Sequence, residues 1–276
     1  MWRLLVGILC VLGLMAIWLH QGTNAVPNRT MPVFRPALTA RVFNEFGLGK
    51  VVMVKVNDAS RLTIWLGNEL YGKRRSGDQA ISVARSMDAS VVMTASFHWW
   101  TGEGFIVLGQ VVYNGENLVS PNPEVLRWQR CYFATTWDGK FLIGETNLTT
   151  GKLIQKLPQI RHLVGGGGWL VKDGDPEAWR LAFAQGFRQD ITNLKRERTV
   201  VAIDKNGKTA WLTVFEGCVS LREAAWFLKR NLPIHHAIFF DGGRNSVLVI
   251  RSQDGEFLSY GTPRPLPEVP CMLVVR

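Results

Sequence analysis

The chain has 276 residues, of which 47% are hydrophobic and 20% charged, so it can bury one substantial hydrophobic core or two small ones. Lysine and arginine outnumber aspartate and glutamate by 32 to 22, which gives a formal net charge of +10 and favours an anionic partner. Apart from short clusters at 73–75 and 195–198, the basic residues are scattered, and they do not alternate with aromatic residues, which argues against nucleic acid. A phosphorylated or acidic glycan, or an acidic surface, is the partner class that this composition favours.

An apolar stretch without a charge covers residues 4–19, directly behind Arg3. It is shorter than the roughly 20 residues that a membrane-spanning helix needs, and its length suits the hydrophobic region of a secretory signal peptide. We expect residues 1–25 to be a signal peptide or, equally, an uncleaved membrane anchor. Residues 26–37 then form a linker that contains prolines, and residues 38–276 form the domain. In either case the domain lies outside the cytoplasm, in a secreted, periplasmic or membrane-anchored protein.

Runs rich in β-branched and aromatic residues predict most of the secondary structure of the domain. Asn114-Gly115, Asp138-Gly139 and Asn206-Gly207 are typical turn dipeptides and predict hairpins. Apolar residues at helical spacing predict helices near 77–89, 177–187 and 220–230. The expected strands are 51–56, 61–66, 91–100, 105–108, 111–113, 129–136, 141–143, 200–204, 209–215, 237–240, 247–250 and, at a sheet edge, 272–275. Many strands with few helices predict an α+β fold, a single domain with mixed β-sheets and several hairpins.

Four consecutive glycines occupy residues 165–168. Either another group approaches this backbone closely, or the segment is a mobile loop. Beyond the amino-terminal stretch the chain has Cys131, Cys218 and Cys271, an odd number without the spacing of a zinc or iron–sulfur site. We expect buried free cysteines, with one disulfide as the alternative, and we expect no metal or other cofactor.

Residues 235–250 combine two strand-like runs with an acid, two glycines, an arginine, an asparagine and a serine between them. Asp241 follows directly on the first run. Gly242 and Gly243 let a ligand approach the main chain closely, and their N–H groups can hold an anion. A carboxylate fixed at a strand end beside such glycines is a candidate site. The alternative is a tight turn between two core strands, because Asp-Gly is a common turn dipeptide.

The segment before Asp241 predicts a helix between two strands. Ser220 and Glu223 have the spacing of a capping box, apolar residues follow at 221, 224, 225 and 228, and Pro233 ends the helix. The strand at 209–215, this helix and the strand at 237–240 therefore predict a crossover of the βαβ kind. Ligands tend to bind at the carboxyl ends of such strands, which is where Asp241 lies.

Several motifs between residues 160 and 250 follow one another in a specific order. They are a glycine-rich loop, Trp169-Leu-Val-Lys-Asp-Gly174, Arg198-Thr199 before a strand, the Asp204–Lys208 hairpin, the capped helix and Phe239-Phe-Asp-Gly-Gly-Arg-Asn-Ser246. This order resembles the phosphodiester glycosidase family, whose best-known members are N-acetylglucosamine-1-phosphodiester alpha-N-acetylglucosaminidases that uncover mannose-6-phosphate. The family's last motif usually ends in Asp-Gly-Gly-Gly-Ser. Here Arg244 replaces the third glycine and Asn245 precedes the serine.

The resemblance implies a hydrolase that breaks the glycosyl–phosphate bond of a sugar-1-phosphodiester in a surface or extracellular glycan. This reaction needs a carboxylate near the anomeric carbon and cations around the phosphate. Asp241 is the expected base or stabiliser of positive charge on the sugar, and His236 is the second catalytic candidate. The candidate substrate-binding residues are Arg198, whose planar guanidinium suits a phosphate, Gly242, Gly243, Arg244, Ser246 and His98.

Each of these residues can instead have a purely structural role. Both histidines can be structural, and Arg198 can instead pair with Glu197 or Glu216. A divalent metal at Asp241 has no ligand cluster to support it. Arg244 can clamp a phosphate or block the pocket, so the second function that these residues allow is an inactive relative that binds an anionic polysaccharide at the envelope.

Overall fold

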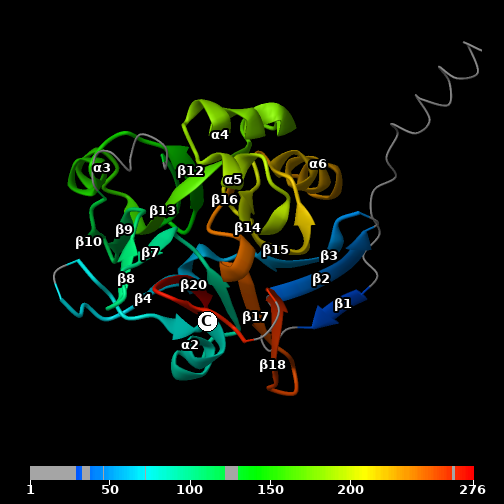
Figure 1. The fold of residues 1–276 in the computed structure, drawn as a ribbon, viewed down its shortest axis with the longest axis horizontal. Coiled ribbons are helices and arrows are strands. Elements are labelled where there is room, and N and C mark those ends of the chain that lie inside the picture. The colour runs from blue at the N-terminus through cyan, green and yellow to red at the C-terminus, as the bar shows by residue number, and fades with distance from the viewer. Residues whose placement is uncertain (1–28, 33–37, 46, 72, 122–129, 263–264) are drawn as a thin grey trace, which may run out of the picture.

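The computed structural model describes residues 29–32, 38–45, 47–71, 73–121, 130–262 and 265–276, and its strands form two large sheets (Figure 1). The 11-stranded sheet runs in the order β1 (Arg29–Pro32), β2 (Leu38–Glu45), β3 (Gly49–Val56), β15 (Ala210–Val219), β14 (Arg196–Ile203), β16 (His236–Phe239), β13 (Ile160–Val171), β11 (Cys131–Thr136) and β12 (Phe141–Glu145), and β9 (Val111–Tyr113) links β13 to β10 (Glu116–Val119). The 5-stranded sheet runs β18 (Phe257–Gly261), β17 (Val247–Arg251), β6 (Val91–Thr94), β20 (Cys271–Val275) and β4 (Leu62–Leu66).

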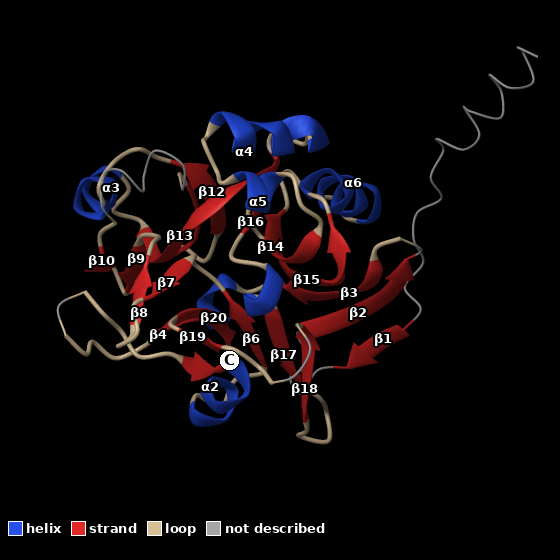
Figure 2. Cartoon of the chain, in the orientation of Figure 1, coloured by secondary structure: helices blue, strands red, loops and turns tan. Residues whose placement is uncertain are grey.

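The remaining elements are short and lie around these sheets (Figure 2). Two small strand pairs join β5 (Asp78–Gln79) to β19 (Glu268–Val269) and β7 (His98–Trp100) to β8 (Phe105–Val107). The helices are α2 (Ala80–Ser86), α3 (Thr150–Lys156), α4 (Leu181–Ala184), α5 (Gln189–Thr192) and α6 (Leu221–Asn231), with 3-10 turns η1 (Ala59–Arg61), η3 (Pro176–Arg180) and η4 (Gly243–Asn245). The chain is a single, mostly β domain with few helices, as expected for the α+β class.

Alternation along the strands builds a layered core. In β3, Val52 and Val54 face the smaller sheet, whereas Val51 and Met53 face α6, because successive side chains of a strand point to opposite faces. The outer face of the smaller sheet packs against α2 in the same way. The order of layers is therefore α6, larger sheet, smaller sheet, α2, and the two helices lie at opposite ends of the molecule in Figure 2.

The predicted helix and its flanking strands form as expected, with one difference. The Ser220 hydroxyl accepts the Glu223 N–H and the Glu223 carboxylate accepts the Ser220 N–H, so the capping box is confirmed. Strands β15 and β16 run in the same direction, because each is antiparallel to β14, which lies between them. Every strand pair of the described residues is antiparallel, so the expectation of mixed sheets is wrong.

The segment that contains Asp241 connects the two sheets. Strand β16 belongs to the larger sheet and β17 to the smaller one, so residues 241–246 do not form the tight hairpin turn that was the alternative. The chain leaves β16 with the Phe240 N–H bonded to Thr199 O at 2.9 Å and the Asp241 N–H bonded to Ala95 O at 3.4 Å. Asp241 therefore lies where the ends of β14, β16 and β6 meet.

The glycine-rich segment is a strand rather than a loop. Residues 165–168 lie inside β13 and are buried. A Cβ atom would stand 2.8 Å from Gln110 N at Gly165 and 2.5 Å from Phe239 O at Gly167. The close-approach alternative is confirmed, and the approaching groups belong to neighbouring segments of the protein itself.

Other expectations need correction. Strand β20 lies between β6 and β4 and is not an edge strand, and the strand expected at 91–100 divides into β6 and β7. The helix expected at 177–187 is reduced to η3 and α4. All three cysteines are free, but only Cys131 and Cys271 are buried. The apolar residues 4–19 lie outside the described residues, within which no helix has the length and apolar character needed to cross a membrane.

Replacing Ser220 by alanine should lower the free energy of unfolding by about 1 kcal/mol, because the first turn of α6 loses its cap. Urea denaturation of wild type and variant measures the change. Ser252→Ala is the control for loss of a serine hydroxyl that does not cap a helix, because the half-buried Ser252 donates to Asp254 and to Glu256 O in the turn after β17. An equal effect of the two substitutions would contradict a specific role of the cap.

Candidate functional site

A cavity of about 560 Å³ opens where several segments end close together in the fold. Strand β16 leads to Asp241, the chain after β6 leads to His98, and the segment from Arg188 to Arg198 completes the wall. The cavity combines aromatic and aliphatic surface with many charged groups. Its lining residues are Phe97, His98, Trp99, Ile106, Leu108, Arg188, Asp190, Ile191, Arg196, Arg198, Phe240, Asp241, Gly242, Arg244 and Asn245.

The Asp241 carboxylate is largely buried, with 13% of the side chain exposed. Oδ1 accepts a hydrogen bond from its neighbour Gly242 N at 3.0 Å, and Oδ2 accepts one from Asn245 Nδ2 at 2.9 Å. Burial raises the pKa of Asp241 above its ordinary value, and this outweighs the opposing effects of His98 and of the two hydrogen bonds. The carboxyl can therefore exchange a proton closer to neutral pH than an exposed aspartate does.

His98 lies beside this carboxylate in an orientation that the neighbouring amide defines. Its Nδ1 is 3.4 Å from Asp241 Oδ2, and its Nε2 is 3.4 Å from Asn245 Nδ2. Since Asn245 Nδ2 is a donor, Nε2 acts as the acceptor, and the neutral imidazole carries its proton on Nδ1, facing Asp241. Phe105 packs edge-on against the ring with centroids 5.2 Å apart. Asn245 thus holds Oδ2 of Asp241 by a hydrogen bond, whereas His98 Nδ1 faces the same oxygen without a hydrogen bond in this structure.

Gly242 and Gly243 are needed for distinct reasons. A Cβ atom at Gly242 would stand 2.7 Å from Glu197 O, so a side chain there would displace the start of β14. Gly243 has a φ angle of +59°, in the left-handed region that favours glycine. The Gly242 N–H already donates to Asp241. Close packing and turn geometry therefore explain both glycines.

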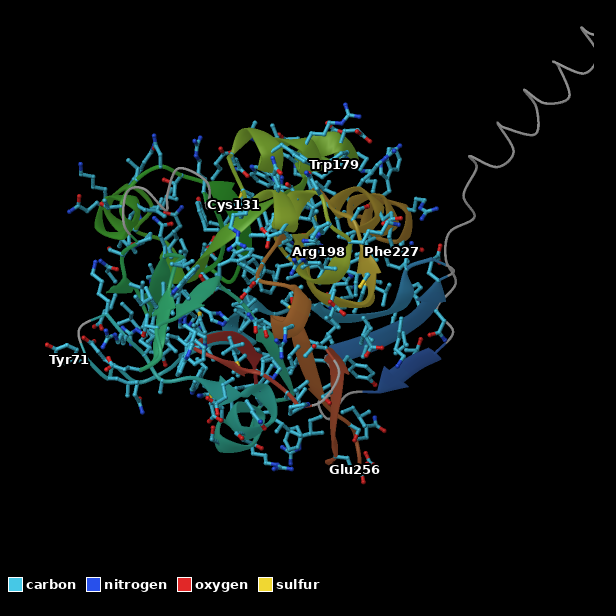
Figure 3. The ribbon with its side chains drawn as sticks, in the orientation of Figure 1. Tyr71, Cys131, Trp179, Arg198, Phe227 and Glu256 are labelled. Carbon is cyan, nitrogen blue, oxygen red and sulfur yellow. The ribbon has the colours of Figure 1, made fainter. Side chains whose placement is uncertain are left out.

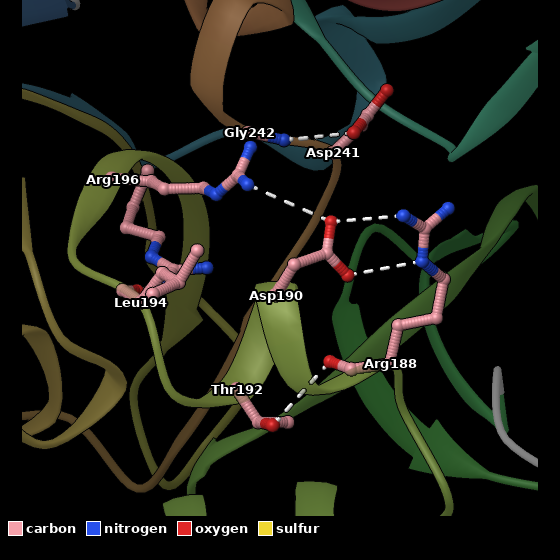
Figure 4. A network of polar contacts seen from close by, with 8 residues as sticks. Arg188, Asp190, Thr192, Leu194, Arg196, Asp241 and Gly242 are labelled. Atoms are coloured by element: carbon pink, nitrogen blue, oxygen red, sulfur yellow. Dashed lines mark hydrogen bonds and ion pairs between the residues drawn. The ribbon is translucent and has the colours of Figure 1, made fainter.

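A chain of ion pairs forms part of the charged wall (Figure 4). Asp190, on α5, accepts two hydrogen bonds from Arg188, from Nε to Oδ1 and from Nη2 to Oδ2, each at 3.0 Å. On the other side of the carboxylate, Arg196 Nη2 is 3.6 Å from Oδ2. Arg196 also lies against the glycine turn, with Nη1 3.5 Å from where a Cβ of Gly243 would be. This network therefore reaches from α5 to the segment that carries Asp241.

The predicted phosphate ligands Arg198, Arg244 and Ser246 differ in how accessible they are from the cavity. Arg198 lines the cavity but is 3% exposed, with Nη2 donating to Leu194 O at 2.6 Å and Nε donating to Val219 O at 3.2 Å. Burial lowers the pKa of Arg198 to about 10. Figure 3 shows Arg198 inside the fold. Arg244 also lines the cavity and is exposed. The Ser246 hydroxyl is buried outside the lining and has no hydrogen-bond partner within the described part of the chain.

His236 does not lie at this cavity. It begins β16, whereas Asp241 follows the end of that strand, so the extended backbone separates them by on the order of 15 Å. His236 instead lines a second cavity of about 550 Å³ with Lys172 and Asp173. His236 and Asp241 are only five residues apart in the sequence, but these residues span the whole of β16.

One group of possible metal ligands occurs among the described residues, and it does not include Asp241. Asp173, His235 and His236 bring one ligand atom each to within 4.8 Å of the others. His236 Nδ1 accepts the Asp173 N–H at 3.2 Å, so the neutral ring carries its proton on Nε2, the nitrogen that faces the Asp173 carboxylate at 3.9 Å. This tautomer offers no lone pair to a metal at Nε2, and we assign no metal site there.

Sequence reasoning missed most of the charged wall. Arg188 and Asp190 precede β14 and Arg196 begins it. None of the three belongs to a motif, although Arg196 is part of the short basic cluster at 195–198. Asn245 was visible only as a departure from the family motif. Trp99 also lines the cavity, and with 59% of the residue exposed it is not part of the core.

Asp241→Asn should stabilise the fold increasingly as the pH rises. Because burial raises the pKa of Asp241 above its ordinary value of 3.8, ionisation of the wild-type carboxyl costs stability as the pH rises from about 4 towards neutrality, and below that range the cost is absent. The asparagine cannot ionise, so the unfolding free energy of the variant relative to wild type should increase over this range in urea titrations. Asp254→Asn, at an exposed turn, controls for removal of a charge. A relative stability that does not vary with pH would contradict this account of Asp241.

Comparisons with known proteins agree with the family resemblance of the sequence. A family model of phosphodiester glycosidases matches residues 87–275. The fold is similar to that of the catalytic domain of zebrafish N-acetylglucosamine-1-phosphodiester alpha-N-acetylglucosaminidase, auto-inhibited by its pro-peptide, with 19% identity, a TM-score of 0.66 and coverage of 93% of this chain and 90% of that chain. It is also similar to that of a hypothetical protein from Synechocystis, with 15% identity, a TM-score of 0.62 and coverage of 92% and 64%. No curated protein sequence matches. The structural similarities show a shared fold, and the family match extends over more than half of the sequence: the chain belongs to the phosphodiester glycosidase family.

Proposed function

We propose that this chain is an extracytoplasmic hydrolase that cleaves the glycosyl–phosphate bond of a sugar-1-phosphodiester in a surface or extracellular glycan. The observation that carries the proposal is the position of Asp241, a largely buried carboxyl in the same cavity as four arginines. Family membership supports the reaction class. The apolar residues 4–19 support a location outside the cytoplasm.

In the proposed reaction, water attacks the anomeric carbon and its proton passes to the ionised Asp241. The bond between the anomeric carbon and the phosphate oxygen breaks, and its electron pair stays on the phosphate, which leaves as a monoester. A phosphate is a good leaving group and needs little protonation, so a single carboxyl can suffice where most glycosidases use two. The raised pKa of Asp241 brings its basicity closer to what proton transfer at neutral pH requires.

The neighbours of Asp241 take supporting roles in this proposal. His98 and Asn245 both contact Oδ2, which leaves Oδ1, bonded to Gly242 N, as the oxygen with fewer side-chain partners. Trp99 presents an exposed ring at the cavity, a surface on which a sugar can stack. The arginines supply the positive charge that a phosphodiester requires.

One observation favours the alternative of a binding protein without turnover. Asn245 occupies a lone pair of Asp241 Oδ2, and Arg244 is exposed at the cavity beside it. Both residues differ from the usual family motif. In an inactive relative, the same cavity would hold an anionic polysaccharide through its arginines while Asp241 served only to orient Asn245 and His98.

Turnover separates the two functions. Phosphorus NMR should show release of a phosphomonoester from at least one of a panel of sugar-1-phosphodiesters, including nucleotide sugars, and Asp241→Asn should lower the rate by about 100- to 10,000-fold, as expected for loss of a general base. Asp254→Asn, at an exposed turn outside the cavity, should retain the wild-type rate.

Equal rates for wild type and Asp241→Asn would remove Asp241 from the chemistry. No release by folded wild-type protein from any member of the panel would overturn the hydrolase in favour of the binding function.

A further inference from the structure

We propose that Arg188 and Arg196 form the phosphate-binding subsite and that Asp190, which bridges them, makes this subsite prefer a singly charged phosphodiester over a doubly charged phosphomonoester. The inference rests on the proposed function, because it identifies where the phosphate of that substrate binds. It goes further in assigning three residues that no sequence motif marks and in giving the carboxylate a role in selectivity.

The geometry of the three side chains fits a shared anion site. Arg188 holds both oxygens of Asp190 in a two-pronged contact, and Arg196 approaches the same carboxylate from the opposite side, as Figure 4 shows. Asp190 uses Nε and Nη2 of Arg188, and no hydrogen bond is made by Arg188 Nη1 within the described part of the chain, so this edge can pair with a phosphate oxygen while Asp190 stays in place. All three side chains are part-exposed at 66%, 34% and 40%, so a ligand can reach them.

Arg196 retains hydrogen-bonding capacity that the protein does not use. Among the described residues its Nε has no hydrogen-bond partner, and its ion pair with Asp190, at 3.6 Å, is longer than a hydrogen bond. Its guanidinium also lies against Gly243, beside the turn that carries Asp241, so a phosphate here would lie next to the proposed catalytic carboxyl.

Arg198 is less suited to this role. Two of its nitrogens already donate to backbone carbonyls, and the side chain is almost fully buried. Its contacts with Leu194 O and Val219 O tie together the segment before β14 and the end of β15. We therefore assign Arg198 to holding this wall in place, in contrast to the expectation from sequence that it binds phosphate directly.

The charge of Asp190 provides the selectivity. A phosphodiester carries one negative charge, whereas a phosphomonoester carries about 1.5 to 2 at pH 7 because its second pKa is near 6. A fixed carboxylate repels the second charge as strongly as the first, so it penalises the monoester more. Since hydrolysis converts the diester into a monoester, Asp190 would favour substrate binding and product release.

Two probes of similar shape test this inference: methyl phenyl phosphate, a diester, and phenyl phosphate, a monoester. Neither contains a glycosyl bond, so calorimetric binding to the purified full chain is independent of turnover, and failure of the hydrolase proposal in the NMR assay would not affect the result. One charge at about 4 Å in water is worth about fivefold in affinity per ligand charge. At pH 8, Asp190→Asn should therefore tighten binding of methyl phenyl phosphate about fivefold and of phenyl phosphate about 25-fold.

The controls isolate the site and the charge. Arg188→Gln and Arg196→Gln should each weaken binding of both probes. Glu177→Gln removes one negative charge from a pair with Arg180 outside the cavity and should leave the ratio of the two affinities unchanged. At pH 5, where phenyl phosphate carries mostly one charge, Asp190→Asn should change both affinities by a similar factor. The same factor for both probes at pH 8, or arginine variants that bind like wild type, would overturn the proposal.

Discussion

The candidate site depends on a carboxyl group held away from water at the point where the chain passes from one sheet to the other. Burying an unpaired carboxylate is costly, and Asp241 lies there with donors from Gly242 and Asn245 and with His98 beside it. Gly242 has no room for a side chain because β14 passes directly behind it. The backbone of the larger sheet therefore fixes the position of Asp241, and its neighbours after β6 and in η4 fix its orientation.

Positively charged side chains outnumber negatively charged ones in the lining of the cavity. The described residues that line the cavity include four arginines, which lie directly before α5, in β14 and in the turn after β16, but two carboxylates, Asp190 and Asp241. Such an excess of positive charge is costly in a protein without a ligand and becomes favourable when an anion binds. Asp190 offsets part of that cost because it pairs with both Arg188 and Arg196. The same carboxylate contributes to the charge that a ligand meets.

The sequence predicts local structure well and distant contacts poorly. The capping box at Ser220, the hairpin turns and most strand positions follow from local rules, and the structure has them. The strand at 91–100 divides before His98, and β14 lies between β15 and β16, because both outcomes depend on which strands pair across the sheet. The hydrophobic periodicity of the sequence does not indicate which strands pair with one another.

The same limit explains which site residues were predictable. Asp241 and its glycines lie in one short motif, so a resemblance over residues 160–250 was enough to select them. Arg188 and Asp190 lie at the cavity because the segment before β14 lies against the start of that strand, where Asp190 pairs with Arg196, and their sequence has no feature of its own. His236 shows the opposite error, since closeness in sequence placed it with Asp241 although an extended strand carries the two apart.

The most direct test of the central claim is to follow hydrolysis of a sugar-1-phosphodiester in water enriched in oxygen-18, with the isotope shift of the phosphorus NMR signal as the readout. If Asp241 directs water to the anomeric carbon, the bond that breaks lies between carbon and oxygen, and the released phosphomonoester contains no oxygen-18. Incorporation of oxygen-18 into the phosphate would mean that water attacks phosphorus instead, and it would contradict the glycosidase mechanism at this site.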